Sequence, residues 1–527
     1  MLTMTDIINA KLSLAGSMSE SELIKYILNE DAVSAKKKRM FEGARYYATE
    51  HDSLNKAYDE SVIEEVEEVD GEENTRRRKL KNPNRSNHHN INTFHTNLVD
   101  QKTAYIAGKE PTFTVKGAAD GGELKTYEDF VTETADEEFN VMLQDWITGA
   151  SNKGAECVHV YYDQDFNLKY CIVPMEEIIP IYDSAFQQEL VELIRYYTMT
   201  VIKRGEKYLR RRVEWWTKDK VTYYIEKEKD VFIPDPDVPV NPAPHFWDVS
   251  FLNGAEKSRL PNSWGRIPFV ILENNSLGTT DLQLNKGLID AYDMISSEGT
   301  NTLLDLVDLY WVIQGYGGET ASAIARLLQI NKAVSINDAG GNIAAHQVDL
   351  SLTGRIELLK MLRRDIYHFG MGVDFDNDTL GAAPSGVSLK FRYSGLRLKA
   401  GKMAPRLKRA IKELFWFLTY DYNRRNNTAF DSELIAVNLN YSEITNDLEQ
   451  VQIIAQSQGV LSERTLIENH PFVTDVNEEL DRIEEEEKQR EDKLDERMNV
   501  NYFGTGEGED NAESGDNNAE EQRGVLG

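Results

Sequence analysis

The sequence has few of the residues that would place it in several common protein classes. Two cysteines, Cys157 and Cys171, occur in 527 residues, so the sequence offers no disulfide framework and no Cys/His spacing typical of zinc sites. No apolar run approaches the ~20 residues that a membrane-spanning helix needs. The N-terminal stretch "MLTMTDIINAKLSLAG" lacks the basic and apolar regions of a signal peptide. These absences predict a soluble intracellular protein without a membrane partner.

The motifs of the common catalytic and cofactor sites are also missing. Neither Gly-Lys pair completes a phosphate-binding P-loop, because Glu110 and Met403 follow them, and "GYGGETA" carries no helix-borne lysine. The sequence contains no H-E-x-x-H, G-x-S-x-G or EF-hand pattern. A cluster of His88, His89 and His95 has no nearby cysteine, and its spacing favours a polar helix start over a metal site. We therefore expect no enzymatic activity, no cofactor and no metal.

Positive charge is scarce overall, since 59 basic residues oppose 89 acidic ones and the net charge is −30. This balance argues against a general nucleic-acid binder, which carries a basic stripe. One segment, 387–425, is nevertheless strongly basic, with Glu413 and Asp421 as its only acids and a net charge of +9. A basic helix in an acidic chain has two natural partners, a polyanion or the acidic surface of a neighbouring subunit. Its cations are Lys390, Arg392, Arg397, Lys399, Lys402, Arg406, Lys408, Arg409, Lys412, Arg424 and Arg425.

Hydrophobic periodicity predicts an α+β protein. Ser19 and Glu22 have the spacing of a capping box and are followed by an apolar helical pattern. Between about 155 and 273 the period changes to two, in short β-rich runs separated by turn residues. The proline-rich stretch 233–245 must be a loop or a sheet edge, because proline cannot donate to a strand ladder. Residues 60–90 consist of charge blocks and are expected to form a solvated loop.

Helical patterns dominate from 281 onwards. Residues 281–310 carry one apolar stripe and a lopsided set of charges, six acids against Lys286. A solvated face is the ordinary interpretation of such charges. Residues 353–370 form a second amphipathic helix, and 387–425 a third that Pro405 should kink or split near Ala404. The acids of the first helix are Asp281, Asp290, Asp293, Glu298, Asp305 and Asp308.

A small, acidic, glycine-containing stretch, "DFDNDTLGAAPSG", lies between the second and third helices. It can bury little apolar surface, and its glycines permit bending. Taken alone, it is an ordinary surface loop. Its members are Asp374, Phe375, Asp376, Asn377, Asp378, Thr379, Leu380, Gly381, Ala382, Ala383, Pro384, Ser385 and Gly386.

The order of these elements resembles the portal proteins of tailed bacteriophages, of the long-tailed type that infects Gram-positive bacteria. In the first half the resemblance rests on "ARYYATEHDSL", "NINTFHTNLVDQKTAYIAGKEPTFTV" and "KYCIVPMEEIIPIYD". It continues through "RIPFVILENNSLGTTDLQLNKGLIDAYDMISSEGTNTL", "PSGVSLKFRYSGL" and "GVLSERTLIENHPFVTDVNEELDRIEEEE". Together these stretches span most of residues 40–490 in the order of the family.

The resemblance implies a ring subunit with a wing, a helical stem, a small α/β clip and a helical crown. Carried over stretch by stretch, it assigns the parts in chain order. These are the wing (1–280), the first stem helix (281–310), the clip (311–352), the second stem helix (353–373), the tunnel loop (374–386), the long wing helix (387–428), the crown (429–500) and a disordered acidic tail (501–527).

The resemblance also implies a function. Twelve copies would form a ring at one capsid vertex of the virion, assembled in the host cytoplasm, and double-stranded DNA would pass through it without sequence specificity. The expected partners are the terminase large subunit, the major capsid and scaffolding proteins, and a head-completion or adaptor protein. The loop 374–386 would touch the DNA, and an acidic stem would let DNA slide. Basic residues that could face DNA are Lys360, Arg363, Arg364, Lys390 and Arg392.

Two other functions remain open from the sequence. One is a nucleic-acid-processing enzyme of the packaging apparatus, which would need a metal-binding acidic cluster. The other is a scaffold protein that stays monomeric and binds partner proteins through its helices. Sizing separates a ring from a monomer, because a ring weighs about ten times as much as one chain.

Overall fold

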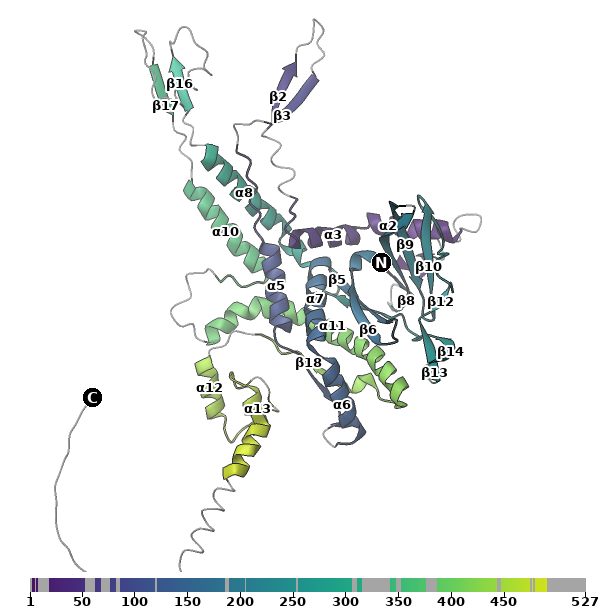
Figure 1. The fold of residues 1–527 in the computed structure, drawn as a ribbon. Helices are drawn as coiled ribbons and strands as arrows, with labels where there is room; N and C mark the ends of the chain where they lie inside the picture. The colour runs from purple at the N-terminus through teal and green to yellow at the C-terminus, as the bar shows by residue number, and fades with distance from the viewer. Residues whose placement is uncertain are drawn as a thin grey trace, which may run out of the picture. The chain divides into compact units, whose positions relative to one another are not determined.

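A computed structural model describes the chain except for residues 1, 5, 8–18, 53–61, 68–75, 82–85, 119–120, 185–188, 204, 253–254, 306–309, 315–341, 347–351, 376–385, 443–446, 474–475, 477–478 and 491–527. The chain divides into two compact units (Figure 1). The first unit contains residues 1–383 and 390–443, and the second contains 384–389 and 444–527. Residues 376–385 of the predicted tunnel loop and the predicted acidic tail (501–527) lie outside the described residues.

A seven-stranded sheet occupies one side of the first unit. Its strands pair antiparallel, except that β1 runs parallel to β7. Helix α2 (Glu20–Val33) packs Ile24 and Ile27 against Ile181 of the sheet, and the predicted capping box is confirmed, since the Ser19 and Glu22 side chains cap each other's backbone N–H. The strands are β1 (Leu2–Thr3), β7 (Ile178–Tyr182), β8 (Leu190–Lys203), β9 (Glu206–Trp216), β10 (Lys220–Glu228), β11 (Val231–Pro234) and β12 (Ala243–Pro244).

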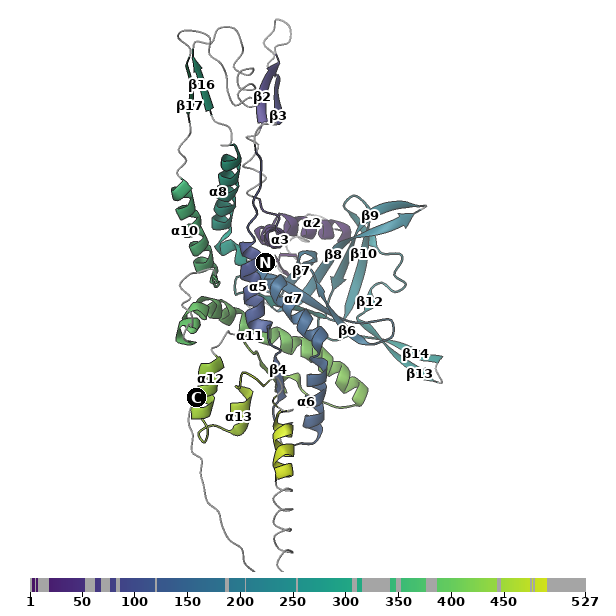
Figure 2. The same ribbon diagram turned by 60° about the vertical axis from the view of Figure 1, so that its left-hand side comes forward.

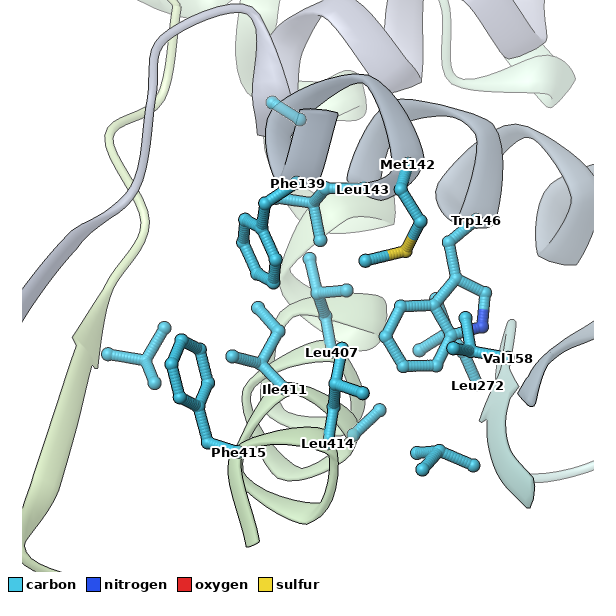
Figure 3. Packing of buried hydrophobic residues seen from close by; sticks show 14 of the residues in the cluster. Phe139, Met142, Leu143, Trp146, Val158, Leu272, Leu407, Ile411, Leu414 and Phe415 are labelled. Atoms are coloured by element: carbon cyan, nitrogen blue, oxygen red, sulfur yellow. The ribbon is translucent and has the colours of Figure 1, made fainter. Parts of the chain in front are cut away.

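The main hydrophobic core lies between helices and a second, three-stranded sheet of order β15-β5-β6. Figure 3 shows Phe139, Leu143 and Trp146 of α7 pointing towards Leu407, Ile411, Leu414 and Phe415 of α11. Full burial of such side chains stabilises by roughly 1.5–3 kcal/mol each. The elements around this core are α5 (Phe94–Ala107), β4 (Thr112–Val115), α6 (Glu123–Thr134), α7 (Glu137–Lys153), β5 (Ala155–Tyr162), β6 (Leu168–Val173), β13 (Phe246–Leu252), β14 (Ala255–Asn262), β15 (Phe269–Glu273), α11 (Gly386–Asn426) and β18 (Ile435–Asn438).

Two helices, α8 (Lys286–Asp305) and α10 (Leu352–Gly370), lie side by side, as both views show (Figures 1 and 2). The Arg355 side chain of α10 donates a hydrogen bond to Thr302 of α8 across this contact. At the base of the pair, Leu282 and Ile289 pack with Tyr46, Leu98 and Ile366. The elements that complete the first unit are α3 (Ala35–Tyr47), β2 (Val62–Glu67), β3 (Arg76–Lys81), η3 (Met175–Glu177), η4 (Asp281–Leu284), β16 (Tyr310–Gln314), β17 (Asn342–His346) and η5 (Ser432–Leu434).

The second unit is helical where the structure describes it. Its helices are α12 (Asp447–Gln456) and α13 (Glu463–Glu468), and residues 479–490 are also helical. Ser462 caps α13 by accepting from the backbone N–H of Thr465. No helix in the described part of the chain is long and apolar enough to cross a membrane.

The predicted α+β class is confirmed, but several boundaries were wrong. The helix predicted for 281–310 begins at Lys286 after a 3-10 turn, and Tyr310 already belongs to a strand paired with β17. The segment 60–90 contains a β2–β3 pair instead of loop alone. The predicted helical segment 429–500 starts with strand β18, which pairs antiparallel with β4 in the first unit.

Proline has the predicted effect in one place and not in the other. The proline-rich stretch supplies β11 at one end of the large sheet and the two-residue β12, as predicted for an edge. Pro405, in contrast, does not split α11, which runs unbroken over 41 residues. Met403, Ala404 and Leu407 around it are buried in the main core, so packing holds the helix together despite the missing hydrogen bond.

Candidate functional site

The structure describes the residues at which the predicted loop leaves α10 and at which α11 begins. Asp374 and Phe375 follow the end of α10, residues 376–385 lie outside the described part, and Gly386 begins α11. The Phe375 side chain is 54% exposed, so it does not join the core. The contacts that the structure describes are therefore those at the start of the loop.

The N-terminal end of the loop is fixed to α5. The Gln101 side chain of α5 accepts a hydrogen bond from the Val373 N–H at 2.8 Å and donates one to the Val373 carbonyl at 2.9 Å. Gly370 and Gly372 allow this approach, because a Cβ at either position would lie 2.7 Å or less from a Leu98 methyl carbon. A side chain at these glycines would push the loop away from α5.

Arg363 of α10 holds the first loop residue itself. Its guanidinium donates two hydrogen bonds to the Asp374 carboxylate, from Nε at 3.0 Å and from Nη2 at 2.8 Å. Both side chains are partly buried. Paired N–H groups facing a carboxylate give a directional contact that a single lysine could not reproduce.

A buried cluster of charges holds the end of α10, just before the loop begins. Lys399 of α11 donates to the Gly370 carbonyl at 3.1 Å and forms an ion pair with Asp281 at 3.1 Å. Lys102 of α5 pairs with the same carboxylate at 3.2 Å and donates to Asn274 Oδ1 at 2.5 Å. The cluster therefore joins α11, the end of α10, α5 and η4 at one point.

The charges in this cluster change each other's pKa values. Burial lowers the pKa of Lys102 to about 8, and Asp281 opposes that shift. Burial alone would raise the pKa of Asp281, but Lys102 and Lys399 together bring it below its ordinary value. Two lysines on one carboxylate leave a buried excess of positive charge, which only good hydrogen-bond geometry can stabilise.

The other predicted basic residues occupy more exposed positions. Lys360 and Arg364 lie four residues apart on α10, on the face away from buried Ile366, but neither is isolated, since Lys360 pairs with Glu357 and Arg364 with Asp365. Near the start of α11, Lys390 is exposed and Arg392 is half-buried. Their contact with DNA stays a prediction.

The acidic face predicted for 281–310 is wrong for three of its members. Asp281 and Asp293 are buried, and the Asp293 carboxylate lies 2.5 Å from Nδ1 of His51. Asp290 accepts hydrogen bonds from Tyr46 at 2.6 Å and from Lys286 at 2.7 Å. Glu298 is exposed, and the side chains of 305 and 308 lie outside the described set. Three of the six acids thus make contacts inside the subunit.

The polar row on α8 has an intramolecular role instead. The extended segment 86–93, which we call the strap, runs along α8 and donates backbone N–H groups to helix side chains at every second residue. His88 N–H bonds Asn301 Oδ1 at 2.6 Å, Asn90 N–H bonds Ser297 Oγ at 2.9 Å, and Asn92 N–H bonds Asp293 Oδ1 at 2.9 Å. Two residues of an extended chain cover about the same length as one turn of an α-helix. Every second N–H of the strap therefore reaches a side chain one turn further along α8.

The three histidines of the predicted cluster lie in different surroundings. His88 lies in the strap, the His89 ring contacts Asn87, and His95 is buried in α5, where burial lowers its pKa to about 4. Among the described residues, no group of three or more His, Cys, Asp or Glu side chains has an arrangement that could hold a metal ion.

Sequence reasoning missed Gln101, which holds the start of the loop, and Lys102 and Asn274, which belong to the buried cluster at the end of α10. Gln101 and Lys102 belong to an unremarkable helical pattern, and Asn274 to the end of a strand. No motif marks them, because their function depends on contacts between segments about 170 to 270 residues apart.

Comparisons with known proteins agree with this arrangement. Residues 26–493 match the family described as phage portal protein, SPP1 Gp6-like. The chain is 29% identical over 488 residues to the portal protein of Bacillus phage SPP1, across 91% of this chain and 89% of that protein. It is also 29% identical over 490 residues to the portal protein of Clostridium phage phiCD119, across 89% of this chain and 96% of that protein.

Proposed function

Because the chain belongs to the SPP1 Gp6-like family of phage portal proteins, we propose that twelve copies form a closed ring through which double-stranded DNA enters and leaves the capsid. Portal proteins are structural, non-enzymatic components of the capsid vertex, so the alternative of a nucleic-acid-processing enzyme is wrong. The ring, the channel and the partners are proposals that go beyond family membership.

Within the ring, the segment 374–386 acts as the tunnel loop. The observation that carries this assignment is the contrast between the loop's ends and its sequence. Gln101 and Arg363 hold the N-terminal end of the loop, and Lys399 the end of α10 before it, whereas the residues that follow are small, polar or glycine apart from Leu380 and Pro384. A segment of this composition that starts from a fixed end can touch a passing polymer without moving the subunit.

The subdomains follow the same assignment. We assign α8 and α10 to the stem, 311–352 to the clip that meets the terminase large subunit and later the head-completion protein, and the second unit to the crown. Residues 429–443 go with the wing, since β18 pairs with β4. The major capsid and scaffolding proteins would surround the ring in the virion, which assembles in the host cytoplasm.

The electrostatics of such a channel depend on few exposed charges. DNA carries one negative charge per ~1.7 Å of its axis, so a dense basic lining would hold it tightly. Lys360 and Arg364 each have a carboxylate neighbour, which weakens their electrostatic attraction to phosphate. Weak, sequence-independent contact suits a conduit.

Electron microscopy of the purified protein in negative stain tests the ring. We expect closed rings with a central hole, and a mass about ten times that of the chain or slightly more. A monomer at micromolar concentration and near-physiological salt would favour the scaffold alternative and contradict the proposal.

A further inference from the structure

A groove of about 590 Å³ lies on the outer side of α11 in the first unit. Charged side chains dominate its lining, although the groove also contains apolar surface. Its charged members include Arg266, Arg406, Arg409, Glu273 and Glu413.

Arg266 and Arg409 act on Glu413 electrostatically, but none of the three arginines of this groove forms an ion pair among the described residues. Among the described residues, no carboxylate oxygen lies within 4.0 Å of the guanidinium groups of Arg266, Arg406 or Arg409. The Arg266 guanidinium lies over the Trp416 ring at 4.1 Å, and Arg406 donates to the carbonyl of Lys402 in its own helix. Exposed Lys402 extends the same row of cations by one turn.

Elsewhere on α11 the cations are neutralised internally. Lys399 pairs with Asp281, Lys412 with Glu433, and Arg424 with Asp421. Within the described part of 399–425, the cations that form no ion pair are Lys402, Arg406, Lys408 and Arg409, and Arg406 and Arg409 line the groove. A concentration of like charge without counter-charge destabilises an isolated subunit and is expected where a partner supplies the opposite charge.

The form of the groove favours carboxylate side chains over nucleic acid as the partner. Glu413 and Glu273 line the groove with the arginines, so only the part beside Arg406 and Arg409 attracts an anion. Glu413 is partly buried, and burial raises its pKa although Arg409 and Arg266 oppose the shift. A concave site with so localised a positive charge suits a few carboxylate side chains better than a duplex.

The chain itself carries a matching acidic surface at the α6–α7 corner. Residues 126–152 contain seven acids and no Lys or Arg. Glu133, Glu137 and Glu138 are exposed there, beside Val141, whose side chain is 61% exposed. None of these three glutamates has a cation within 4.0 Å among the described residues.

The corner and the groove lie on opposite sides of α11. Phe139 of α7 packs against Phe415, and Tyr127 of α6 bonds Thr419 at 2.7 Å, so α6 and α7 cover the buried side of the helix (Figure 3). Arg406 precedes Phe415 by nine residues, about two and a half helical turns, and so points the other way. The two surfaces of one subunit cannot meet each other.

From this arrangement we infer that the α11 groove receives the α6–α7 corner of a second copy of the chain, with Glu137 and Glu138 opposite Arg406 and Arg409. The contact joins two different surfaces, which is the kind that closes a ring. The inference rests on the proposed ring and adds the surfaces that hold neighbouring copies together.

Charge reversal tests this contact. Two variants are made in the full chain, R406E/R409E and E137K/E138K, and assembly is followed by light scattering and negative stain. Each variant alone presents like charges at the contact, so we expect rings to dissociate at concentrations at least tenfold higher than for the unmodified protein. The control K227E/K229E changes exposed lysines of the β10–β11 turn and should assemble normally.

Mixing the two variants gives the decisive result. In an equimolar mixture every groove can meet a corner of opposite charge, so rings should return, and a chain carrying all four reversals should also assemble. Rescue also shows that both variants are folded.

Rings from each single-surface variant, or no rescue on mixing, would overturn the inference while leaving the ring itself intact. So would normal assembly of R406E/R409E with lost DNA retention, which would assign the groove to nucleic acid. Absence of rings in the unmodified protein would instead refute the proposed function.

Discussion

Arg363 and Asp374 join the last turns of α10 to the first residue of the loop through two parallel hydrogen bonds. The contact places a residue predicted to face DNA in a structural position, since its guanidinium is already engaged by a carboxylate. It also explains why an acid stands at the start of the loop. The direction in which the loop leaves α10 depends on this pair, together with Gln101 and Val373.

Replacing Arg363 by lysine keeps the charge and removes the paired geometry. For Arg363→Lys we expect a loss of about 1 kcal/mol in the free energy of unfolding, because the site is only partly buried. The more specific result is faster hydrogen exchange at residues 371–375. Arg364→Lys, at an exposed neighbouring position, is the matched control. Unchanged exchange at 371–375 would show that the pair does not hold the loop.

Deleting Thr379–Ala383 tests whether the loop acts on DNA. The deletion leaves the contacts of Val373 and Asp374 in place, so the fold and the assembly of rings should be unchanged in circular dichroism and negative stain. DNA packaged per particle should fall, as measured in an in vitro packaging reaction. A deleted protein that no longer assembles would give the segment a structural function.

The buried cluster predicts unequal effects for its members. Asp281→Asn leaves Lys102 and Lys399 buried without a counter-charge and should lower the free energy of unfolding by about 3–5 kcal/mol. Lys102→Met leaves one lysine on one carboxylate and should cost far less. Chemical denaturation of both variants measures the difference. Equal losses would mean that the excess positive charge is not a feature of the folded state.

The sequence predicted elements better than their functions. Local patterns located the capping box at Ser19, the β-rich region and the edge character of the proline-rich stretch, because each depends on neighbouring residues. The same patterns assigned Asp281, Asp290 and Asp293 to an exposed acidic face. Their partners, Lys102, Tyr46 and His51, lie between about 180 and 245 residues away, and a helical period cannot distinguish a solvated acid from one buried against a distant segment.

The loop also shows which features the sequence could predict and which it could not. Its composition indicated a segment outside the core, and glycines at 381 and 386 indicated bending. Nothing in the composition indicated that Gly370 and Gly372 would permit close contact with Leu98, or that Lys399 would reach the end of α10. These contacts are long-range packing, which the order of residues alone does not specify.

The strap provides another test of an interaction that the sequence did not reveal. In Asn301→Leu the hydrogen bonds to the backbone N–H and carbonyl of His88 are lost, and both groups need new partners. We expect a loss of about 1–3 kcal/mol and faster hydrogen exchange across residues 86–93. Thr302→Val, at the next position but facing Arg355 of α10, is the control for substitution in this turn. Equal exchange in the two variants would contradict the role of the Asn301 side chain.

The pKa of Lys102 gives stability an unusual dependence on pH. In the folded state this pKa is about 8, whereas an unfolded lysine has a pKa near 10.4. Between these values the unfolded chain binds more protons, so the Lys102 contribution to the free energy of unfolding rises with pH by up to about 1.4 kcal/mol per unit. The measurement is the difference in free energy of unfolding between the unmodified protein and Lys102→Met at pH 7, 8, 9 and 10. Subtracting the variant removes the other titrating groups, whose effects are common to both proteins. This difference in free energy of unfolding should move in favour of the unmodified protein above pH 8. A constant difference across this range would show that Lys102 titrates normally and is not held in a water-excluded cluster.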